Sequence, residues 1–471
     1  MDHFDLCVIG SGPAGQKAAV QAAKLGKRVC VIEKAQVLGG AAINTGTIPS
    51  KSLREAILHL TGFQGRAFLG ESNQPRQKIT IEDLISWCNT VIKAEIEVIR
   101  GHLIRNDIEI INGYGAFQST DWVVSVNGGD VRAINADHIL VATGTRPATP
   151  SDIPFDGVRI VDADGLLRLQ YLPRTLLVVG GGVIGTEYAS MMQALGVKVT
   201  LVEGRGRLLE FLDSEVSEAL QYHLRQTGMG LRMGEKVVKV ELVDAPDGAA
   251  ARDGKLVQAT LESGKTLKAE CLLYCIGRQG NTEGLELEKV GLTADNRGRI
   301  KVNDRYQTDV PNIYAAGDVI GFPALASTSM EQGRLAACHM FGKKTDSVAA
   351  LFPYGIYAIP EISMVGWTEE KLTEEGVPYE TGVANYKEIA RGQLLGDHVG
   401  MLKLLIHQET RAILGVHCIG NGATEIVHIG QAVMALGGTV DYFINTVFNY
   451  PTLAECYKVA ALNGANKLAH V

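Results

Sequence analysis

Two glycine-rich stretches of the sequence could bind phosphate groups. Their glycines share one spacing, with Gly10, Gly12 and Gly15 in IGSGPAG and Gly180, Gly182 and Gly185 in VVGGGVIG. The first glycine makes a tight turn, the second lets the backbone approach a pyrophosphate, and the third lets a helix pack closely on a strand. Because each stretch follows an apolar strand and opens a helix, the N-terminus of that helix faces the phosphates. Each stretch therefore predicts a dinucleotide-binding turn.

A glutamate ends the strand that follows each turn. Glu33 closes the run KRVCVIE, and Glu203 closes VKVTLVE. A carboxylate in this place accepts hydrogen bonds from the hydroxyl groups of a ribose. A chain with two such sites is most simply explained by one flavin nucleotide and one nicotinamide nucleotide, because hydride transfer needs a donor and an acceptor.

The second site also carries arginines that could read the 2′ position of the ribose. Arg205 and Arg207 follow Glu203 in VEGRGRLLE. Glu203 would accept from the 2′-hydroxyl of NAD and repel the 2′-phosphate of NADP, whereas the planar guanidinium of Arg205 could bind that phosphate through two hydrogen bonds. The glycines on either side of Arg205 leave the loop free to present it. We therefore expect dual specificity; the alternative is that Arg205 is only solvated and that Arg207 is an arginine which NAD-only proteins also carry.

The segment GGAAINTGTIPSK, residues 39–51, combines small side chains with one reactive-looking group, Lys51. Glycine and alanine leave the backbone accessible, so this segment can pack closely against a flat or crowded partner. It holds no obvious nucleophile.

The elements around these residues alternate between strands and helices. Residues 1 to about 147 contain the apolar runs DLCVIG, KRVCVIEK, IEIINGYGAF and DHILVATG, together with a helical pattern over about 82–106. Short apolar strands between helices indicate a parallel sheet. The signature restarts near Arg174, and Gly10 and Gly180 lie 170 residues apart (180 − 10), which indicates a duplicated domain. After about residue 346, antiparallel strands with a polar turn at HQETRA and two closing helices predict an α+β domain.

Composition places the chain among ordinary globular proteins. Its 471 residues, 46% apolar and 21% charged, suggest about three domains at ~150 residues each. A net charge of −7 without a basic stripe argues against nucleic-acid binding, and no apolar run reaches the ~18 residues of a membrane span. The acidic start MDHFD predicts no signal peptide. The eight cysteines form no CxxC pair or disulfide-like pattern, so we expect buried thiols, no metal site and a reducing compartment, the cytoplasm.

Three stretches carry a specific resemblance: GGAAINTGTIPSK, ATGTRP and IYAAGDVIG. They are similar to the flavoprotein disulfide reductases, the class I pyridine nucleotide-disulfide oxidoreductases that include lipoamide dehydrogenase and glutathione reductase, and the similarity runs through the whole chain. The resemblance implies an α/β fold with two Rossmann-like domains, an FAD-binding domain over 1–147 and 275–345 and an NAD(P)-binding domain over 148–274, plus an α+β dimerisation domain over 346–471. It also implies non-covalently bound FAD, NAD(H) and NADP(H) as substrates, and a homodimer or larger homo-oligomer.

The same resemblance implies roles for single residues. Asp318 would bond the ribityl chain of FAD, and the candidate catalytic residues Lys51 and Glu187 would pair close to flavin N5, where a positive charge stabilises the anionic reduced flavin. Alternatively, Lys51 is a solvated helix lysine and Glu187 is favoured by the helix dipole. Arg146 and Arg278 would lie near the nucleotides, unless they form only surface ion pairs. The other candidate cofactor-binding residues, including those of the two glycine-rich turns, are Gly10, Gly12, Gly15, Glu33, Lys34, Gly39, Gly40, Ala41, Ala42, Gly115, Gly144, Gly180, Gly182, Gly185, Glu203, Arg205 and Gly277.

The sequence departs from the disulfide reductases at two places. Those enzymes carry two cysteines spaced CxxxxC within this segment, whereas Ala42 and Thr47 hold the positions here, so no redox disulfide can form beside the flavin. They also carry an acid–base histidine before a C-terminal proline. Tyr450 holds that position in NYPTLAE, although Glu455 remains. A tyrosine hydroxyl holds its proton too tightly to shuttle it at neutral pH.

With the dithiol step lost and both nucleotide turns kept, the sequence resembles the transhydrogenase branch of this family. This implies an Si-specific NAD(P)+ transhydrogenase in which hydride passes reversibly between NADPH and NAD+ through flavin N5. One alternative is an NAD(P)H oxidase or diaphorase that passes electrons to oxygen or quinones. Another is a flavin-binding protein without activity, whose nucleotide motifs should have decayed; neither has. We expect His417 and His428 to be structural.

Overall fold

The chain folds into two compact units. The computed structural model describes residues 2–61, 80–246, 251–345 and 351–468. The first unit consists of Met1–Leu53, Ile85–Ala148 and Gly277–Ala349, and the second consists of Arg54–Leu84, Thr149–Ile276 and Ala350–Val471. No helix of the described residues is long and apolar enough to cross a membrane.

The first unit is built on a seven-stranded sheet with the strand order β3-β2-β1-β6-β5-β4, and β17 pairs with the end of β6. Its strands are β1 (Asp2–Ile9), β2 (Val29–Glu33), β3 (Glu109–Asn112), β4 (Tyr114–Ser119), β5 (Trp122–Asn127), β6 (Asp130–Val141) and β17 (Ile313–Ala315). β3, β2, β1, β6 and β17 are parallel neighbours, whereas β4, β5 and the first half of β6 pair antiparallel. A short ladder joins β7 (Thr145–Pro147) to β16 (Arg278–Gly280).

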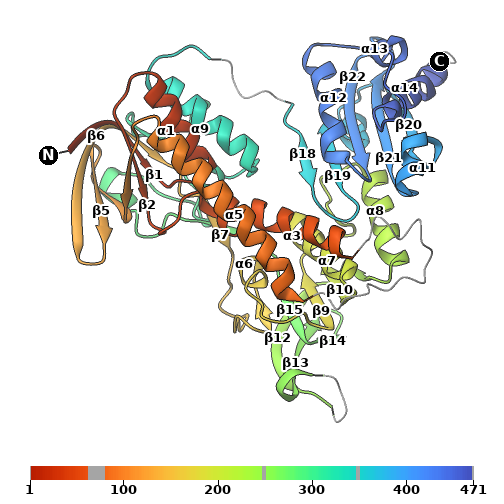
Figure 1. Cartoon of the computed structure of the whole chain (residues 1–471), viewed down its shortest axis with the longest axis horizontal. Coiled ribbons are helices and arrows are strands. Elements are labelled where there is room, and N and C mark those ends of the chain that lie inside the picture. Colours follow the sequence, from red (N-terminus) through yellow and green to blue (C-terminus); the bar gives the residue numbers. More distant parts are fainter. Residues whose placement is uncertain (1, 62–79, 247–250, 346–350, 469–471) are drawn as a thin grey trace. The chain divides into compact units, whose positions relative to one another are not determined.

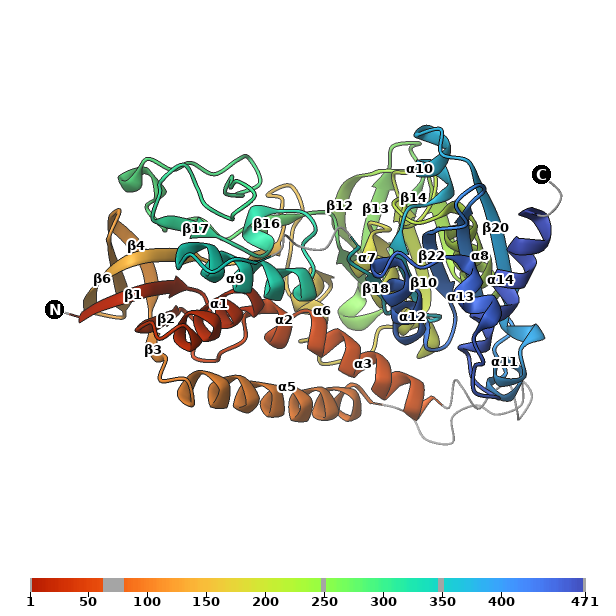
Figure 2. The same cartoon turned by 90° about the horizontal axis from the view of Figure 1, so that it is seen from above.

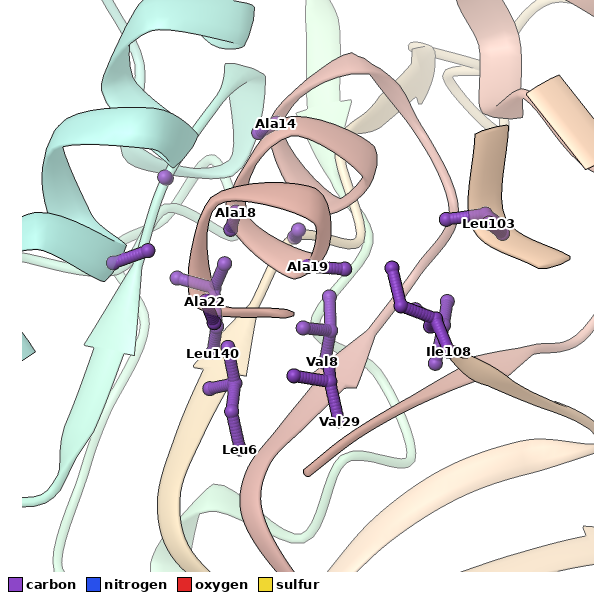
Figure 3. Packing of buried hydrophobic residues seen from close by; sticks show 14 of the residues in the cluster. Leu6, Val8, Ala14, Ala18, Ala19, Ala22, Val29, Leu103, Ile108 and Leu140 are labelled. Atoms are coloured by element: carbon purple, nitrogen blue, oxygen red, sulfur yellow. The ribbon is translucent and has the colours of Figure 1, made fainter. Parts of the chain in front are cut away.

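Small residues let two helices pack closely on this sheet. α1 (Pro13–Lys24) and α9 (Ala326–Met340) lie side by side (Figures 1 and 2). A Cβ added to Gly333 of α9 would lie 2.0 Å from Ala14 O of α1, so only glycine allows this approach. Figure 3 shows the alanines of α1 over Leu6 and Val8 of β1, in the apolar cluster that this face of the sheet buries.

Among the described residues, further helices lie between these strands. They are α2 (Gly40–Asn44), α3 (Thr47–Leu60) and α5 (Ile81–Ile104). The helix that the sequence predicts over about 82–106 is confirmed by α5.

The second unit repeats the same topology. Its parallel five-stranded sheet has the order β11-β10-β9-β15-β8. Leu6 pairs with Val29 in the first unit, and Leu176 pairs with Val199 here, so both partners shift by 170 residues (176 − 6 and 199 − 29). The predicted duplication is therefore confirmed at the level of strand register. The elements are β8 (Ile160–Val161), α6 (Ala163–Leu166), β9 (Thr175–Val179), α7 (Val183–Ala194), β10 (Lys198–Glu203), α8 (Ser214–Gln226), β11 (Gly230–Met233) and β15 (Cys271–Tyr274).

Two antiparallel sheets complete the second unit. The smaller contains β12 (Val237–Asp244), β13 (Lys255–Leu261) and β14 (Thr266–Ala269). The C-terminal sheet has the order β18-β19-β22-β21-β20, and α14 runs along β20 (Figure 2). Its strands and helices are β18 (Tyr354–Ile356), β19 (Ile362–Gly366), α10 (Glu369–Glu374), β20 (Tyr379–Asn385), α11 (Ala390–Leu395), β21 (Met401–His407), β22 (Ile413–Ile419), α12 (Ala423–Ala435), α13 (Val440–Asn445) and α14 (Glu455–Leu468). The predicted antiparallel α+β region is confirmed.

The run IEIINGYGAF, which the apolar pattern suggests as one strand, forms two. β3 ends at Asn112, and β4 begins at Tyr114. Gly113 between them has a φ of 149°, and a Cβ on it would lie 2.2 Å from Ser125 Oγ. Glycine thus allows the chain to leave the parallel part of the sheet and start an antiparallel meander.

Candidate functional site

The two glycine-rich turns have the same geometry. Gly10 and Gly180 adopt φ angles of 106° and 108°, a region that favours glycine. A Cβ on Gly15 would lie 2.0 Å from Gly10 O, and one on Gly185 would lie 1.9 Å from Gly180 O. α1 and α7 begin directly after the middle glycines, and no side chain of the described residues caps either helix. Their first N–H groups can therefore bind an anion such as a pyrophosphate.

Glu33 is tied to the first turn by a serine that the sequence analysis missed. Ser11 donates to Glu33 Oε2 through its N–H at 2.9 Å and through its Oγ at 2.6 Å, and Ala35 N donates to Glu33 Oε1 at 2.8 Å. Ser11 Oγ also accepts from Gly39 N at 3.0 Å. The serine therefore links the Glu33 carboxylate, the turn and the start of segment 39–51.

Segment 39–51 packs its glycines against the first turn. A Cβ on Gly40 would lie 2.8 Å from Gly12 Cα, so the segment touches the backbone of the turn. Ala41 is exposed, and Ala42, in α2, is partly exposed. The segment therefore lies next to the uncapped start of α1, where the sequence predicts a cofactor.

The candidate catalytic residues lie on α3 and α7. Lys51 Nζ of the first unit donates to Ser50 Oγ at 3.3 Å. Glu187 of the second unit is buried, and its Oε1 accepts from Tyr357 N at 2.8 Å. The pairing of Lys51 with Glu187 stays a prediction.

Asp318 lies at the end of a short chain of hydrogen bonds within the first unit. Its Oδ2 accepts from Thr145 Oγ1 at 3.2 Å, and its Oδ1 accepts from Ser329 Oγ at 3.3 Å. Thr145 Oγ1 in turn accepts from Arg278 Nε at 2.7 Å, so Arg278 orients Thr145. The neighbouring Thr143 Oγ1 is buried and makes no hydrogen bond to the described residues. A polar group of a bound ligand could supply the hydrogen bond that this hydroxyl lacks.

Glu203 repeats the arrangement of Glu33 with one difference. Gly181 N donates to Glu203 Oε2 at 2.6 Å, and Arg205 N donates to Oε1 at 2.9 Å, as Ser11 N and Ala35 N do in the first unit. The side-chain donor is Arg205 Nε, at 3.0 Å from Oε1, where the first unit uses a serine hydroxyl. Burial alone would raise the pKa of Glu203, but these bonds outweigh it and lower the pKa. The carboxylate is therefore charged at neutral pH.

The remaining predicted cofactor residues have identifiable local surroundings. A Cβ on Gly115 would lie 2.9 Å from Ile9 Cγ2, so packing alone already requires a glycine there. Gly144 and Gly277 adopt φ angles of 65° and 84°, and Lys34 is exposed next to Glu33. Their contacts with a cofactor stay predictions. Arg146, which was also expected near the nucleotides, forms an exposed ion pair with Glu283 at 2.7 Å. A surface ion pair is the alternative that the sequence analysis left open for it.

Near the C-terminus, Tyr450 holds the position where the disulfide reductases carry their acid–base histidine. The described residues around it form no proton relay. The Tyr450 side chain is 68% exposed, whereas Glu455 Oε2 is buried without a hydrogen-bond partner among the described residues. His417 is buried, and its Nε2 lies 2.9 Å from Trp367 O, so this nitrogen carries the proton. His428 Nδ1 contacts Gln431 Oε1 at 2.8 Å. His417 is buried, whereas His428 is exposed on α12; the structural role that the sequence suggests for each stays a prediction.

All eight cysteines are free thiols, and only Cys275 is not fully buried. Ala42 and Thr47 stand in segment 39–51 where the disulfide reductases carry their thiol pair.

Two family profiles match most of the chain. The profile of the pyridine nucleotide-disulphide oxidoreductases matches residues 4–333, and the profile of their dimerisation domain matches residues 352–461. The chain belongs to this family. Membership implies FAD and nicotinamide nucleotides, and the dimerisation domain indicates a homo-oligomer.

Several relatives of this chain are soluble pyridine nucleotide transhydrogenases. The chain is 52% identical over 470 residues to a soluble pyridine nucleotide transhydrogenase of Mycobacterium bovis, covering 99% of this chain and 98% of the relative. It is 46% identical over 473 residues to a protein of that name from Vibrio parahaemolyticus, with 99% of each chain covered. A third such protein, from Colwellia psychrerythraea, is 45% identical over 470 residues, covering 99% and 98%. These relatives support a transhydrogenase role.

Two solved structures have the same fold as this chain. LpdA from Mycobacterium tuberculosis superposes with a TM-score of 0.87 at 27% identity, covering 98% of this chain and 99% of that one. The HOCl-induced flavoprotein disulfide reductase RclA from Escherichia coli, as a Cu(II) complex, gives a TM-score of 0.86 at 27% identity with the same coverage.

Proposed function

We propose that this chain is an FAD-dependent transhydrogenase that moves hydride between NADPH and NAD+ in either direction. The observation that carries the proposal is the presence of two complete dinucleotide turns in a chain whose segment 39–51 has Ala42 and Thr47 where a thiol pair would stand. FAD, bound without a covalent link, would supply the chemistry, because flavin N5 can take up a hydride and release it again. The transhydrogenases that resemble this chain support the same reaction.

The residues of the first unit would hold FAD. The helix after Gly12 would bind the pyrophosphate, Glu33 the ribose hydroxyls and Asp318 the ribityl chain. The uncapped α1, the close approach of Gly40 to Gly12 and the orphaned Thr143 hydroxyl support this assignment. We assign FAD binding to residues 1–147 and 275–345, NAD(P) binding to 148–274 and dimerisation to 346–471.

Lys51 would stabilise negative charge on the reduced cofactor. Because Glu187 is buried and fixed by Tyr357 N, it could hold the Lys51 ammonium in one orientation. Segment 39–51 would contribute no redox group, and its small residues would allow close contact with the flavin ring.

The second turn would take both nicotinamide nucleotides in succession. Glu203 would accept from the 2′-hydroxyl of NAD(H), and Arg205 would leave Glu203 to bind the 2′-phosphate of NADP(H). Arg205 can exchange one partner for the other, because its side chain is half exposed and is held to Glu203 only by an ion pair.

Steady-state transfer from NADPH to thio-NAD+ tests the proposed function. We expect the purified, yellow protein to reduce thio-NAD+ at the expense of NADPH without air. Absence of bound flavin, or a flavin that neither nucleotide reduces, contradicts the proposal. For Si-specific transfer, deuterium at the pro-S position of NADPH C4 should slow flavin reduction, and deuterium at the pro-R position should not.

We place this reaction in the cytoplasm, where reducing conditions keep free thiols such as those of this chain. A homodimer or larger homo-oligomer is expected to carry it out. Exposed apolar side chains in the C-terminal part, including Leu436 (88% exposed) and Val447 (89%), support such an assembly.

A further inference from the structure

The 204–213 segment, which carries Arg205, is packed against the second glycine turn. Leu209 N donates to Gly181 O at 3.1 Å, and a Cβ on Gly181 would lie 2.6 Å from Leu208 Cδ2. Leu208 and Leu209 are 0% and 1% exposed. The middle of the segment therefore cannot leave the turn without exposing apolar side chains to water.

Helix α10, from the C-terminal part of the second unit, holds the same segment through a carboxylate. Arg207 Nη1 lies 3.1 Å from Glu370 Oε1, and the same oxygen accepts from Ser214 N at 3.0 Å. Arg207 Nη2 donates to Glu210 O at 3.0 Å, inside the segment. Glu370 thus joins an arginine near the start of the segment to the residue that follows its end.

A buried ion cluster fixes the end of the segment as well. Lys403 of β21 and Asp213 are both fully buried, with Nζ and Oδ1 2.9 Å apart. Lys403 Nζ also lies 2.9 Å from Glu215 Oε2 and contacts Glu369 Oε1. These three carboxylates are close enough together to bind a metal ion, but the Lys403 ammonium lies among them and supplies the positive charge.

The two groups that would read the 2′ position depend on these contacts to different degrees. Glu203 Oε2 accepts from Gly181 N at 2.6 Å, so the turn itself orients this carboxylate. Arg205 reaches Glu203 only from the segment. A looser segment should therefore disturb Arg205 more than Glu203.

We propose that Glu370 is a positioning residue for coenzyme selection, which holds Arg207 and Ser214 so that the backbone of Arg205 stays in place while its side chain turns from Glu203 to the 2′-phosphate of NADP(H). The proposal rests on the proposed function, because it takes the second turn as the nicotinamide nucleotide site. A preorganised loop binds more tightly than a mobile one, since less conformational freedom is lost on binding. Loss of the Glu370 carboxylate should thus weaken the binding of NADP(H) more than the binding of NAD(H).

Titration calorimetry with NADP+ and NAD+ on the FAD-loaded full chain tests this. For Glu370→Gln we expect the Kd of NADP+ to rise by about 5–10-fold and the Kd of NAD+ by less than about twofold, because only the ordering of the segment is lost. The rate of flavin reduction at saturating NADH should not change. Glu374→Gln is the matched control, since Glu374 lies on the same helix and pairs with Lys371 at the surface; both Kd values should stay as in the wild type.

A double-mutant cycle with Arg207→Gln asks whether Glu370 acts through Arg207. If it does, the double variant should bind NADP+ no more weakly than the weaker single variant. An unchanged Kd for NADP+ in Glu370→Gln, an equal rise for both nucleotides, the same loss in Glu374→Gln, or additive effects in the double variant would each overturn the proposal.

Failure of the proposed function gives a different result. Calorimetry requires no hydride transfer, so a wild-type chain that binds both nucleotides without exchanging hydride contradicts the proposed function alone. A wild-type chain that binds neither nucleotide contradicts both.

Discussion

Replacing Arg205 by alanine should weaken the binding of NADPH and leave the binding of NADH almost unchanged. The Arg205 side chain is 49% exposed, its Nε lies 3.0 Å from Glu203 Oε1, and its Nη1 lies 3.7 Å from Glu210 Oε2. A charged hydrogen bond to the 2′-phosphate contributes about 1.5–3 kcal/mol. Moving the guanidinium off Glu203 costs about 0–1 kcal/mol, because the arginine is half in water.

The difference, about 0.5–3 kcal/mol, corresponds to a rise of about 2–150-fold in the Kd of NADPH. In this variant Glu203 can still accept from the ribose of NADH, although the Arg205 guanidinium no longer lies beside it. The Kd of NADH should therefore change by less than about twofold. Anaerobic stopped-flow reduction of the flavin over a range of each nucleotide gives both constants. Arg225→Ala, which removes an exposed charge near the end of α8, is the control and should change neither. An equal loss for both nucleotides, or none for NADPH, means that another group reads the phosphate.

Three other changes test separate parts of the account. Lys51→Ala should slow flavin reduction by about tenfold or more while FAD stays bound; an unchanged rate in stopped flow removes Lys51 from the mechanism. Ala42→Cys with Thr47→Cys should give no appreciable lipoamide reduction, since Tyr450 still lacks the acid–base role; robust disulfide reduction by the unmodified protein would show that the alignment of the segment is wrong. Burial alone would raise the pKa of Glu370, but hydrogen bonds lower it from 4.5 to about 2, so this carboxylate stabilises the fold above pH 4.5 and loses that contribution as the pH falls towards 2. Glu370→Gln should therefore melt at a lower temperature than the wild type at pH 7, and the gap should narrow below pH 4.5; a constant gap contradicts the assigned pKa.

The glycine turns could be predicted from the sequence because their determinants are local. Gly10 and Gly15 lie within one motif, and the strand pairs follow from a repeat that shifts Leu6 onto Leu176. The meander β4–β5–β6 was harder to predict, because an apolar run that contains Gly113 has the pattern of one strand. Only the positive φ angle of that glycine, which the structure shows, separates the run into two strands.

The contacts around the second site could not be predicted from spacing. Lys403 interrupts the apolar run MLKLLIH, which signals a buried partner, but its partners Asp213 and Glu369 are 190 and 34 residues away. Ser11 lies 22 residues from Glu33, in a position of the glycine motif where many side chains fit. Such pairs form only when the strands and helices are assembled, so local patterns cannot identify them.

The central claim is that reduced flavin in this protein returns its hydride to a nucleotide. The most direct measurement is a single turnover without air: the bound FAD is reduced with one equivalent of NADPH, NADP+ is removed, and NAD+ is added. We expect the yellow colour of the oxidised flavin to return rapidly, with one NADH formed for each flavin. A flavin that NADPH bleaches but that only oxygen or a quinone reoxidises would contradict the claim and identify an oxidase or diaphorase instead.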